Sequence, residues 1–108
     1  MTLRPIEFHV LLALAGEDLH GYAILQEVSR LTDGDLEIEP GTLYRALHRM
    51  LRDGWVLEST RRPAADVDDE RRRYYRLTPL GRRVAMAEAD RLSRLLSIAR
   101  SHKLLSRA

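Results

Sequence analysis

Basic side chains recur at helical spacing in the middle of the chain, opposite a row of apolar ones. Within residues 40–53 the basic side chains are Arg45, His48, Arg49 and Arg52. The apolar ones are Leu43, Leu47, Met50 and Leu51. Such a helix packs its apolar side on the rest of a domain, so its basic side faces solvent or an anionic ligand. The chemistry to consider first is therefore the binding of phosphate groups.

A glycine stands in the first turn of this predicted helix. Pro40 suits the first helical position, but Gly41 is a poor helix former and costs about 1 kcal/mol relative to alanine in a helix interior. It could relieve crowding where the chain enters the helix. It could instead let the helix start lie against a phosphate, where free N–H groups and the positive end of the helix dipole favour an anion. The Thr42 hydroxyl could donate to the same phosphate.

A second set of basic side chains flanks the segment Arg61–Arg71, which is predicted to be the mobile tip of a hairpin. Its members are Arg61, Arg62, Arg71, Arg72, Arg73 and Arg76. Two basic patches separated by the width of a hairpin are typical of a recognition helix in the DNA major groove with a wing over the flanking backbone. Acidic residues at 66, 68, 69 and 70 argue against deep insertion of the tip. Double-stranded DNA is the expected partner.

Other kinds of chemistry have little support. The chain contains no cysteine, which excludes disulfides and cysteine-ligated metals. Its histidines are scattered over different elements, and no motif for nucleophilic, phosphate-transfer or dinucleotide chemistry occurs. We therefore expect no enzyme, no metal site and no cofactor. No apolar run approaches the roughly 18 residues of a membrane helix, so we expect a soluble, cytoplasmic protein without a membrane partner.

The periodicity of the whole chain predicts the elements that would position these side chains. Helices are expected at about Arg4–Ala15, Gly21–Leu31 and Pro40–Asp53, and a long one starts at Thr78–Pro79 and continues to about Lys103. Short strands are expected at Leu36–Glu39, Trp55–Thr60 and Arg72–Leu77. This order predicts an α+β, mainly α, winged helix-turn-helix. Residues 1–78 would form the DNA-binding domain and residues 79–108 a dimerisation helix.

The long last helix carries more apolar side chains than a small domain can bury. Its stripe consists of Leu92, Leu95, Leu96 and Ala99. Soluble monomers avoid contiguous exposed apolar patches, and each buried leucine is worth about 1.5–3 kcal/mol. A homodimer is therefore expected, with Ile6 and Val10 of the first helix contributing to the interface. Its recognition helices would stand about 34 Å apart and face an inverted repeat. Folding of the tail onto its own wing is the less favoured alternative.

Four sequence blocks together resemble the PadR-like transcriptional regulators. They are "HGYAI" at His20–Ile24, "PGTLYRALHRML" at Pro40–Leu51, "DGWV" at Asp53–Val56 and "RRRYYRLTPLG" at Arg71–Gly81. The resemblance implies a homodimeric bacterial repressor that is released from its operator by a small-molecule inducer. It places Thr42, Tyr44, Arg45, His48 and Arg49 at or near DNA, and Arg72, Arg73 and Tyr74 along the wing. Tyr22 and Tyr44 could each contact a phosphate or pack in the core; packing is favoured for Tyr22, and both alternatives stay open for Tyr44.

The single terminal helix resembles that of the short members of this family, some of which sense drugs with an aromatic pocket at the dimer interface. Residues 78–108 contain no aromatic side chain, so an aromatic sandwich on this helix is not expected. A ligand pocket would instead be lined by Leu, Met and Ala, with Phe8 from the first helix. The alternative function is a winged-helix protein–protein interaction module. Such a module should lack the two basic clusters or carry acidic residues on its third helix.

Overall fold

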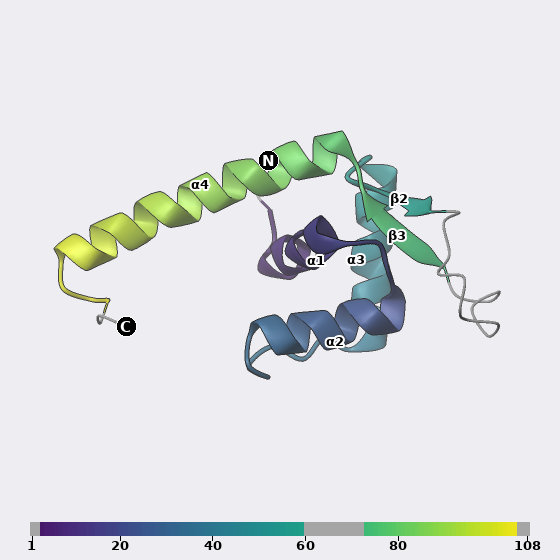
Figure 1. Ribbon diagram of the computed structural model, residues 1–108, viewed down its shortest axis with the longest axis horizontal. Helices are drawn as coiled ribbons and strands as arrows, with labels where there is room; N and C mark the ends of the chain where they lie inside the picture. Colours follow the sequence, from purple (N-terminus) through teal and green to yellow (C-terminus); the bar gives the residue numbers. More distant parts are fainter. Residues whose placement is uncertain (1–2, 60–72, 106–108) are drawn as a thin grey trace.

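The computed structural model describes residues 3–59 and 73–105, which fold as a winged helix (Figure 1). Its elements, in chain order, are α1 (Pro5–Gly16), β1 (Leu19–His20), α2 (Gly21–Leu31), α3 (Pro40–Arg52), β2 (Val56–Ser59), β3 (Tyr74–Leu77) and α4 (Pro79–Ser101). The helices α1, α2 and α3 pack together beside a small sheet, and the N-terminal half of α4 crosses over α1. The mainly helical winged-helix prediction is confirmed.

The sheet has three antiparallel strands in the order β1-β3-β2. β2 and β3 form the wing hairpin, with Val56 opposite Leu77 and Ser59 opposite Tyr74. The other edge of β3 pairs with β1, which places Leu19 opposite Tyr75. The predicted hairpin tip at Arg61–Arg71 lies outside the described residues.

The strand predicted at Leu36–Glu39 is wrong. The alternation that suggested it is real, because Leu36 and Ile38 are half-buried against the core while Glu37 and Glu39 are exposed. Among the described residues, however, this segment pairs with no strand, and the sheet consists of β1, β3 and β2. The third strand comes instead from Leu19–His20, a segment too short to show a period in the sequence.

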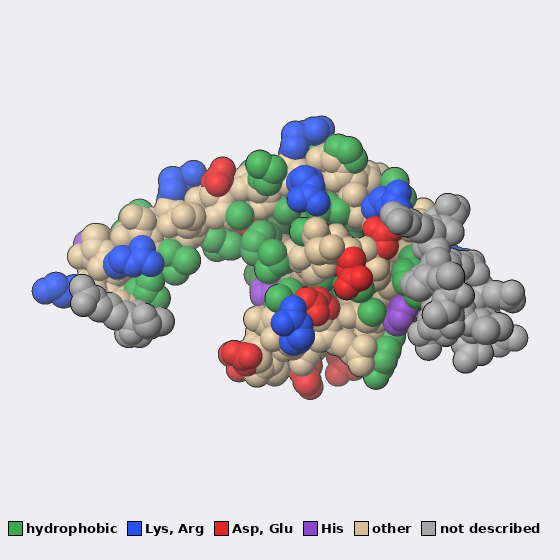
Figure 2. Space-filling view, in the orientation of Figure 1, with side chains coloured by type: hydrophobic (Ala, Val, Ile, Leu, Met, Phe, Trp, Pro, Cys, Tyr) green, Lys and Arg blue, Asp and Glu red, His purple; other side chains and the backbone are tan. Residues whose placement is uncertain are grey.

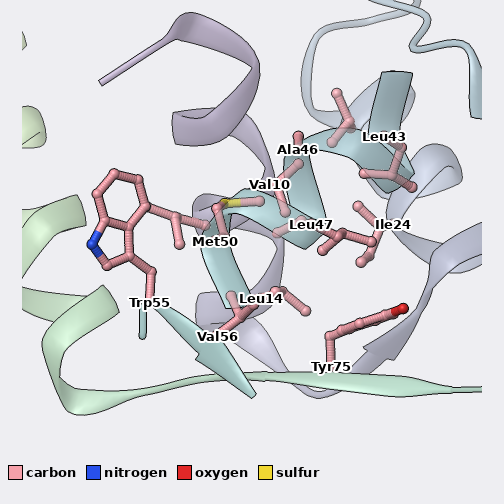
Figure 3. Packing of buried hydrophobic residues seen from close by; sticks show 13 residues of the cluster. Val10, Leu14, Ile24, Leu43, Ala46, Leu47, Met50, Trp55, Val56 and Tyr75 are labelled. Carbon is pink, nitrogen blue, oxygen red and sulfur yellow. The ribbon is translucent and has the colours of Figure 1, made fainter. Parts of the chain in front are cut away.

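The core lies between α1, α2, α3 and the sheet (Figure 3). Its buried members include Val10, Leu14, Ile24, Leu43, Ala46, Leu47, Met50, Trp55, Val56 and Tyr75. Trp55 reaches the core because Gly54, with a φ of 80°, ends α3 in a Schellman turn. Its own N–H then donates to the Met50 carbonyl at 2.9 Å. The last buried turn of α3 is thereby joined directly to the residues that lead into β2.

The start of α4 is fixed to this same turn. The Thr78 hydroxyl lies 2.6 Å from the Gly54 carbonyl oxygen and accepts the Gly81 N–H at 2.9 Å. A Cβ added at Gly81 would overlap the Trp55 carbonyl oxygen, so only glycine allows α4 to approach this closely. No helix in the described part of the chain is long and apolar enough to cross a membrane.

Candidate nucleic-acid interface

The third helix, α3, turns one face into the core and the other outward. Leu43, Ala46, Leu47 and Met50 are buried on its inner face. Tyr44, Arg45, His48 and Arg52 are exposed. Burial of four apolar side chains fixes the rotation of the helix about its axis, since any large rotation would bring them into water. The basic side therefore points away from the domain, as the spacing predicted.

The first turn of α3 has open space around Gly41. Among the described residues, an added Cβ would meet only Nη1 of Arg45, at 3.4 Å, and no backbone or core atom within 4 Å. Crowding therefore does not explain this glycine. The Arg45 side chain reaches back along the helix and donates from Nη2 to the Thr42 hydroxyl at 3.2 Å. The exposed Gly41 and Arg45 and the half-buried Thr42 thus form one surface at the positive end of the helix dipole.

Two tyrosines lie beside this surface where α2 begins. The Tyr44 ring covers Gly21, since a Cβ there would come within 2.5 Å of the tyrosine hydroxyl. Gly21 is therefore needed for α2 and α3 to approach each other at this point. Tyr22, in the first turn of α2, is 62% exposed, so the packing role that we favoured for it is wrong. The HGYAI block indicates the start of α2 in the sequence, but its spacing does not show whether the Tyr22 side chain is buried or exposed.

Arg49 differs from the other basic residues of α3. Its side chain is 27% exposed, and its Nε lies 3.5 Å from Oε2 of Glu7, in the first turn of α1. Glu7 is itself only 5% exposed and was not singled out from the sequence. The helix-wheel pattern could not distinguish Arg49 from Arg45, because the difference depends on where α1 crosses the last turn of α3.

The described arginines of the wing are paired with acids. Arg73 lies 3.2 Å from Glu58, its neighbour across the hairpin. Arg76 donates from Nη2 to Asp18 at 3.0 Å, and Ser59 donates to the same carboxylate at 3.0 Å. Asp18 therefore joins the loop before β1 to both other strands. The predicted wing residues Arg61, Arg62, Arg71 and Arg72 lie outside the described residues.

Tyr74, predicted to line the wing surface, is 7% exposed, and this burial corrects the expectation. Its ring packs edge-to-face on His20, with 5.3 Å between ring centroids. His20 also caps α2, since its Nδ1 accepts the Ala23 N–H at 3.1 Å. The neighbouring Tyr75 is buried too, and this burial, together with the nearby Glu58 carboxylate, raises the pKa of its hydroxyl above the ordinary tyrosine value.

The second half of α4 presents an apolar face. Leu95 and Leu96 are each 49% exposed, and Ile98, absent from the predicted stripe, is exposed as well. Leu92 and Ala99 are half-buried. Figure 2 shows hydrophobic side chains along the side of α4 that faces the hollow beside the helical core. Ile6 is half-buried on α1, but Val10 is fully buried within the protomer, which removes it from the surface where it was expected.

A cavity of about 420 Å³ lies between the beginning of the chain, Trp55 and α4. It is lined by Leu3, Trp55, Val84, Ala87, Glu88, Arg91 and Arg94. This lining contains Leu and Ala but neither Met nor Phe8, and it includes an indole and three charged side chains. The dimer-interface pocket of Leu, Met and Ala with Phe8 stays a prediction. No group of three His, Asp or Glu side chains among the described residues could hold a metal ion.

The sequence profile of the PadR-like family of transcriptional regulators matches residues 10–87. The chain belongs to this family. The transcriptional regulator Rv3488 of Mycobacterium tuberculosis (strain ATCC 25618 / H37Rv) is 39% identical over 77 residues, which are 71% of this chain and 65% of that protein. Protein X of Lysinibacillus sphaericus is 35% identical over 74 residues, 68% of this chain and 64% of that protein. The match thus spans slightly less than two thirds of each relative.

Solved structures of transcriptional regulators share the fold. A transcriptional regulator from Clostridium thermocellum, Cth-833, superposes with a TM-score of 0.72 at 25% identity, over 89% of this chain and 87% of that chain. Bacillus subtilis PadR, solved in complex with operator DNA, gives a TM-score of 0.65 at 17% identity, over 80% of this chain and 47% of that chain. The family match confirms the resemblance to PadR-like transcriptional regulators that was drawn from the sequence.

Proposed function

We propose that this PadR-like protein is a homodimeric repressor that binds an inverted-repeat operator through α3 and is released by a small-molecule inducer. The observation that carries the proposal is the exposed basic face of α3, held outward by four buried apolar side chains. Bacillus subtilis PadR, which shares the fold, has been solved with operator DNA. We extend that mode of binding to this chain.

In this proposal α3 enters the major groove, where some of its exposed side chains contact bases and its first turn contacts a phosphate. Arg45 and His48 contact base edges, since they occupy the middle of the exposed face. The open first turn with Gly41 and Thr42 lies against a phosphate, as backbone N–H groups at helix starts do. Tyr22 and Tyr44, both exposed residues, are further candidates for phosphate contacts. The basic side chains of the wing, Arg72 and Arg73, contact the flanking backbone.

The dimer would form through α4, with residues 1–78 as the DNA-binding domain and residues 79–108 as the dimerisation helix. Leu95, Leu96 and Ile98 are exposed on one protomer, and their burial against a second copy is worth about 1.5–3 kcal/mol for each side chain that becomes fully buried. Ile6 adds to the interface from α1. The two recognition helices would then stand about 34 Å apart, one DNA turn.

DNA binding is tested by fluorescence anisotropy on the promoter DNA of the protein's own gene, with and without competitor DNA. Arg45→Ala should lower operator affinity about tenfold or more and relax discrimination, since a base contact is worth about 1–3 kcal/mol. Arg30→Ala is the matched control. It removes an exposed arginine from the far end of α2, where Arg30 pairs with Glu27, and should leave binding unchanged. If the affinity for promoter DNA changes neither with salt concentration nor with Arg45→Ala, the result would favour a protein–protein interaction module instead.

The oligomeric state is tested by sedimentation of a Leu95→Arg, Leu96→Arg variant. Two charges in the apolar stripe should convert the dimer to monomers that keep the helix content of the parent. Leu31→Arg provides the comparison, because Leu31 is an exposed leucine at the end of α2, away from α4. A parent protein that sediments as a monomer, or a doubly substituted variant that stays dimeric, would contradict the assigned interface.

A further inference from the structure

Glu7 is the buried charged residue of the described chain, and its carboxylate joins two helices. Oε1 accepts the N–H of Arg4, the residue that precedes α1, at 2.9 Å. Oε2 lies 3.5 Å from Nε of Arg49, in the last turn of α3. Burial of a carboxylate is unfavourable unless hydrogen bonds and an opposite charge compensate it, and here both do.

The dipoles of α1 and α3 favour the charges of Glu7 and Arg49 at the positions that these residues occupy. Glu7 lies at the positive end of the α1 dipole and Arg49 at the negative end of the α3 dipole, so each charge is stabilised by its own helix as well as by the other. The 3.5 Å separation is an ion pair and not a hydrogen bond. Nε of Arg49 is buried and has no hydrogen-bond partner among the described residues. The attraction to Glu7 is what offsets that burial.

Without this attraction Arg49 would join the basic face. Residues four apart on a helix differ by about 40° around its axis, so Arg49 lies nearly in line with Arg45. Arg45 is exposed, whereas Arg49 is mostly buried beside α1. The direction of the Arg49 side chain therefore depends on its partner and not on its place in the helical pattern.

We propose that Glu7 is a positioning residue for the recognition helix: its carboxylate holds the Arg49 guanidinium against α1, fixes the orientation of α3 and keeps Arg49 off the DNA-facing side. This inference rests on the proposed DNA-binding function. It assigns Arg49 a role opposite to the DNA contact expected from the sequence. Discrimination between sequences would then depend on a charge in α1 that never touches DNA.

The test measures the salt dependence of binding to non-specific DNA, which counts phosphate contacts. Each contact contributes about −0.9 to the slope of log K against log salt. Glu7→Gln keeps an oxygen for the Arg4 N–H but removes the charge, so the freed Arg49 should steepen the slope by about 1.8 per dimer. The ratio of operator to non-specific affinity should fall about tenfold, as for one misplaced base contact. Glu27→Gln, which removes a carboxylate paired with Arg30 at the far end of α2, changes the net charge equally and should do neither.

Two further variants complete the test. In the Glu7→Gln, Arg49→Gln double variant the slope should return to that of the parent. Arg49→Gln alone keeps the hydrogen bond from the Arg4 N–H to Glu7 and serves if Glu7→Gln does not fold. It should lower the operator ratio without changing the slope, whereas Arg73→Gln, at a residue that we assign to the flanking DNA backbone, should flatten the slope. A flatter slope for Arg49→Gln, or a steeper one for Glu27→Gln, would overturn the inference.

If the proposed DNA-binding function is wrong, the parent protein itself will show no salt-dependent binding of DNA. Urea unfolding of the parent, the two single variants and the double variant then still decides whether Glu7 and Arg49 stabilise the fold through their interaction. The effects of the two single substitutions on the unfolding equilibrium constant should be less than multiplicative in the double variant. Independent effects would show that Glu7 does not position Arg49.

Discussion

Replacement of Gly41 by alanine should change stability and DNA binding in opposite directions. The added methyl group would meet only the tip of the exposed Arg45 side chain, at 3.4 Å, so the folded protein can accept it. Alanine also loses less backbone entropy on folding than glycine does. We therefore expect a gain of up to about 1 kcal/mol in the free energy of unfolding, or a rise of a few degrees in Tm.

The same methyl group should weaken operator binding. It stands on the exposed first turn of α3, where the proposed phosphate lies against backbone N–H groups. A hydrogen bond to a charged group is worth about 1.5–3 kcal/mol, so loss of one in each half-site should lower the affinity of the dimer about a hundredfold or more. Anisotropy titration gives the affinity, and thermal unfolding followed by circular dichroism gives the stability of the same samples.

Gly16→Ala is the matched control for this experiment. Gly16 ends α1, and an added Cβ there has no described atom within 4 Å. This substitution should leave operator affinity unchanged without lowering stability. Unaltered operator binding by Gly41→Ala would refute the close approach of a phosphate. A Tm lowered by several degrees would show that the first turn is crowded after all.

Three other substitutions test the framework that holds the interface. Gly81→Ala should lower the free energy of unfolding by about 3 kcal/mol in urea, because the added Cβ overlaps the Trp55 carbonyl oxygen and neither backbone can move aside easily. Unchanged stability would contradict this contact. Asp18→Asn should cost about 1 kcal/mol, because its pair with Arg76 is partly exposed to solvent, and a loss of zero would show that the pair does not stabilise the sheet. Tyr75 has a raised pKa in the folded protein, so the neutral form is favoured and stability should fall as the pH rises above about 10. Tyr75→Phe should make unfolding less dependent on pH in that range, and an unchanged pH profile would exclude Tyr75 as its source.

The periodic elements could be predicted from the sequence because local patterns determine them. The second helix begins and ends at Gly21 and Leu31, as expected, and α3 ends one residue earlier than expected. Failures occurred where a distant segment decides. Leu19–His20 becomes a strand only because β3 lies beside it, some 55 residues later in the chain. Leu36–Glu39 alternates in burial but has no such partner.

The orientation of individual side chains on the candidate site depends on the same long-range packing. Arg45 and Arg49 are equivalent in the helical pattern, yet only Arg49 lies where Glu7 can reach it. Tyr22 and Tyr74 each stand in a family block, but the first is exposed and the second is covered by His20. The sequence therefore predicted which helix carries the basic face, and tertiary contacts decide which of its residues belong to that face.

The junction of α3 and α4 limits how a signal at the dimer interface could reach DNA. The Thr78 hydroxyl donates to the Gly54 carbonyl and the Thr78 N–H to the Trp55 carbonyl, which joins the start of α4 to the turn that ends α3. Gly81 adds a backbone contact with Trp55 that admits no side chain. The two helices must then move together. If α4 pairs as we propose, each recognition helix lies about 17 Å from the two-fold axis, and a rotation of about 5° in the pairing would shift it by roughly 1.5 Å. Hydrogen bonds to base edges tolerate a few tenths of an ångström, so a rotation this small is enough to release the operator without any change inside the winged helix.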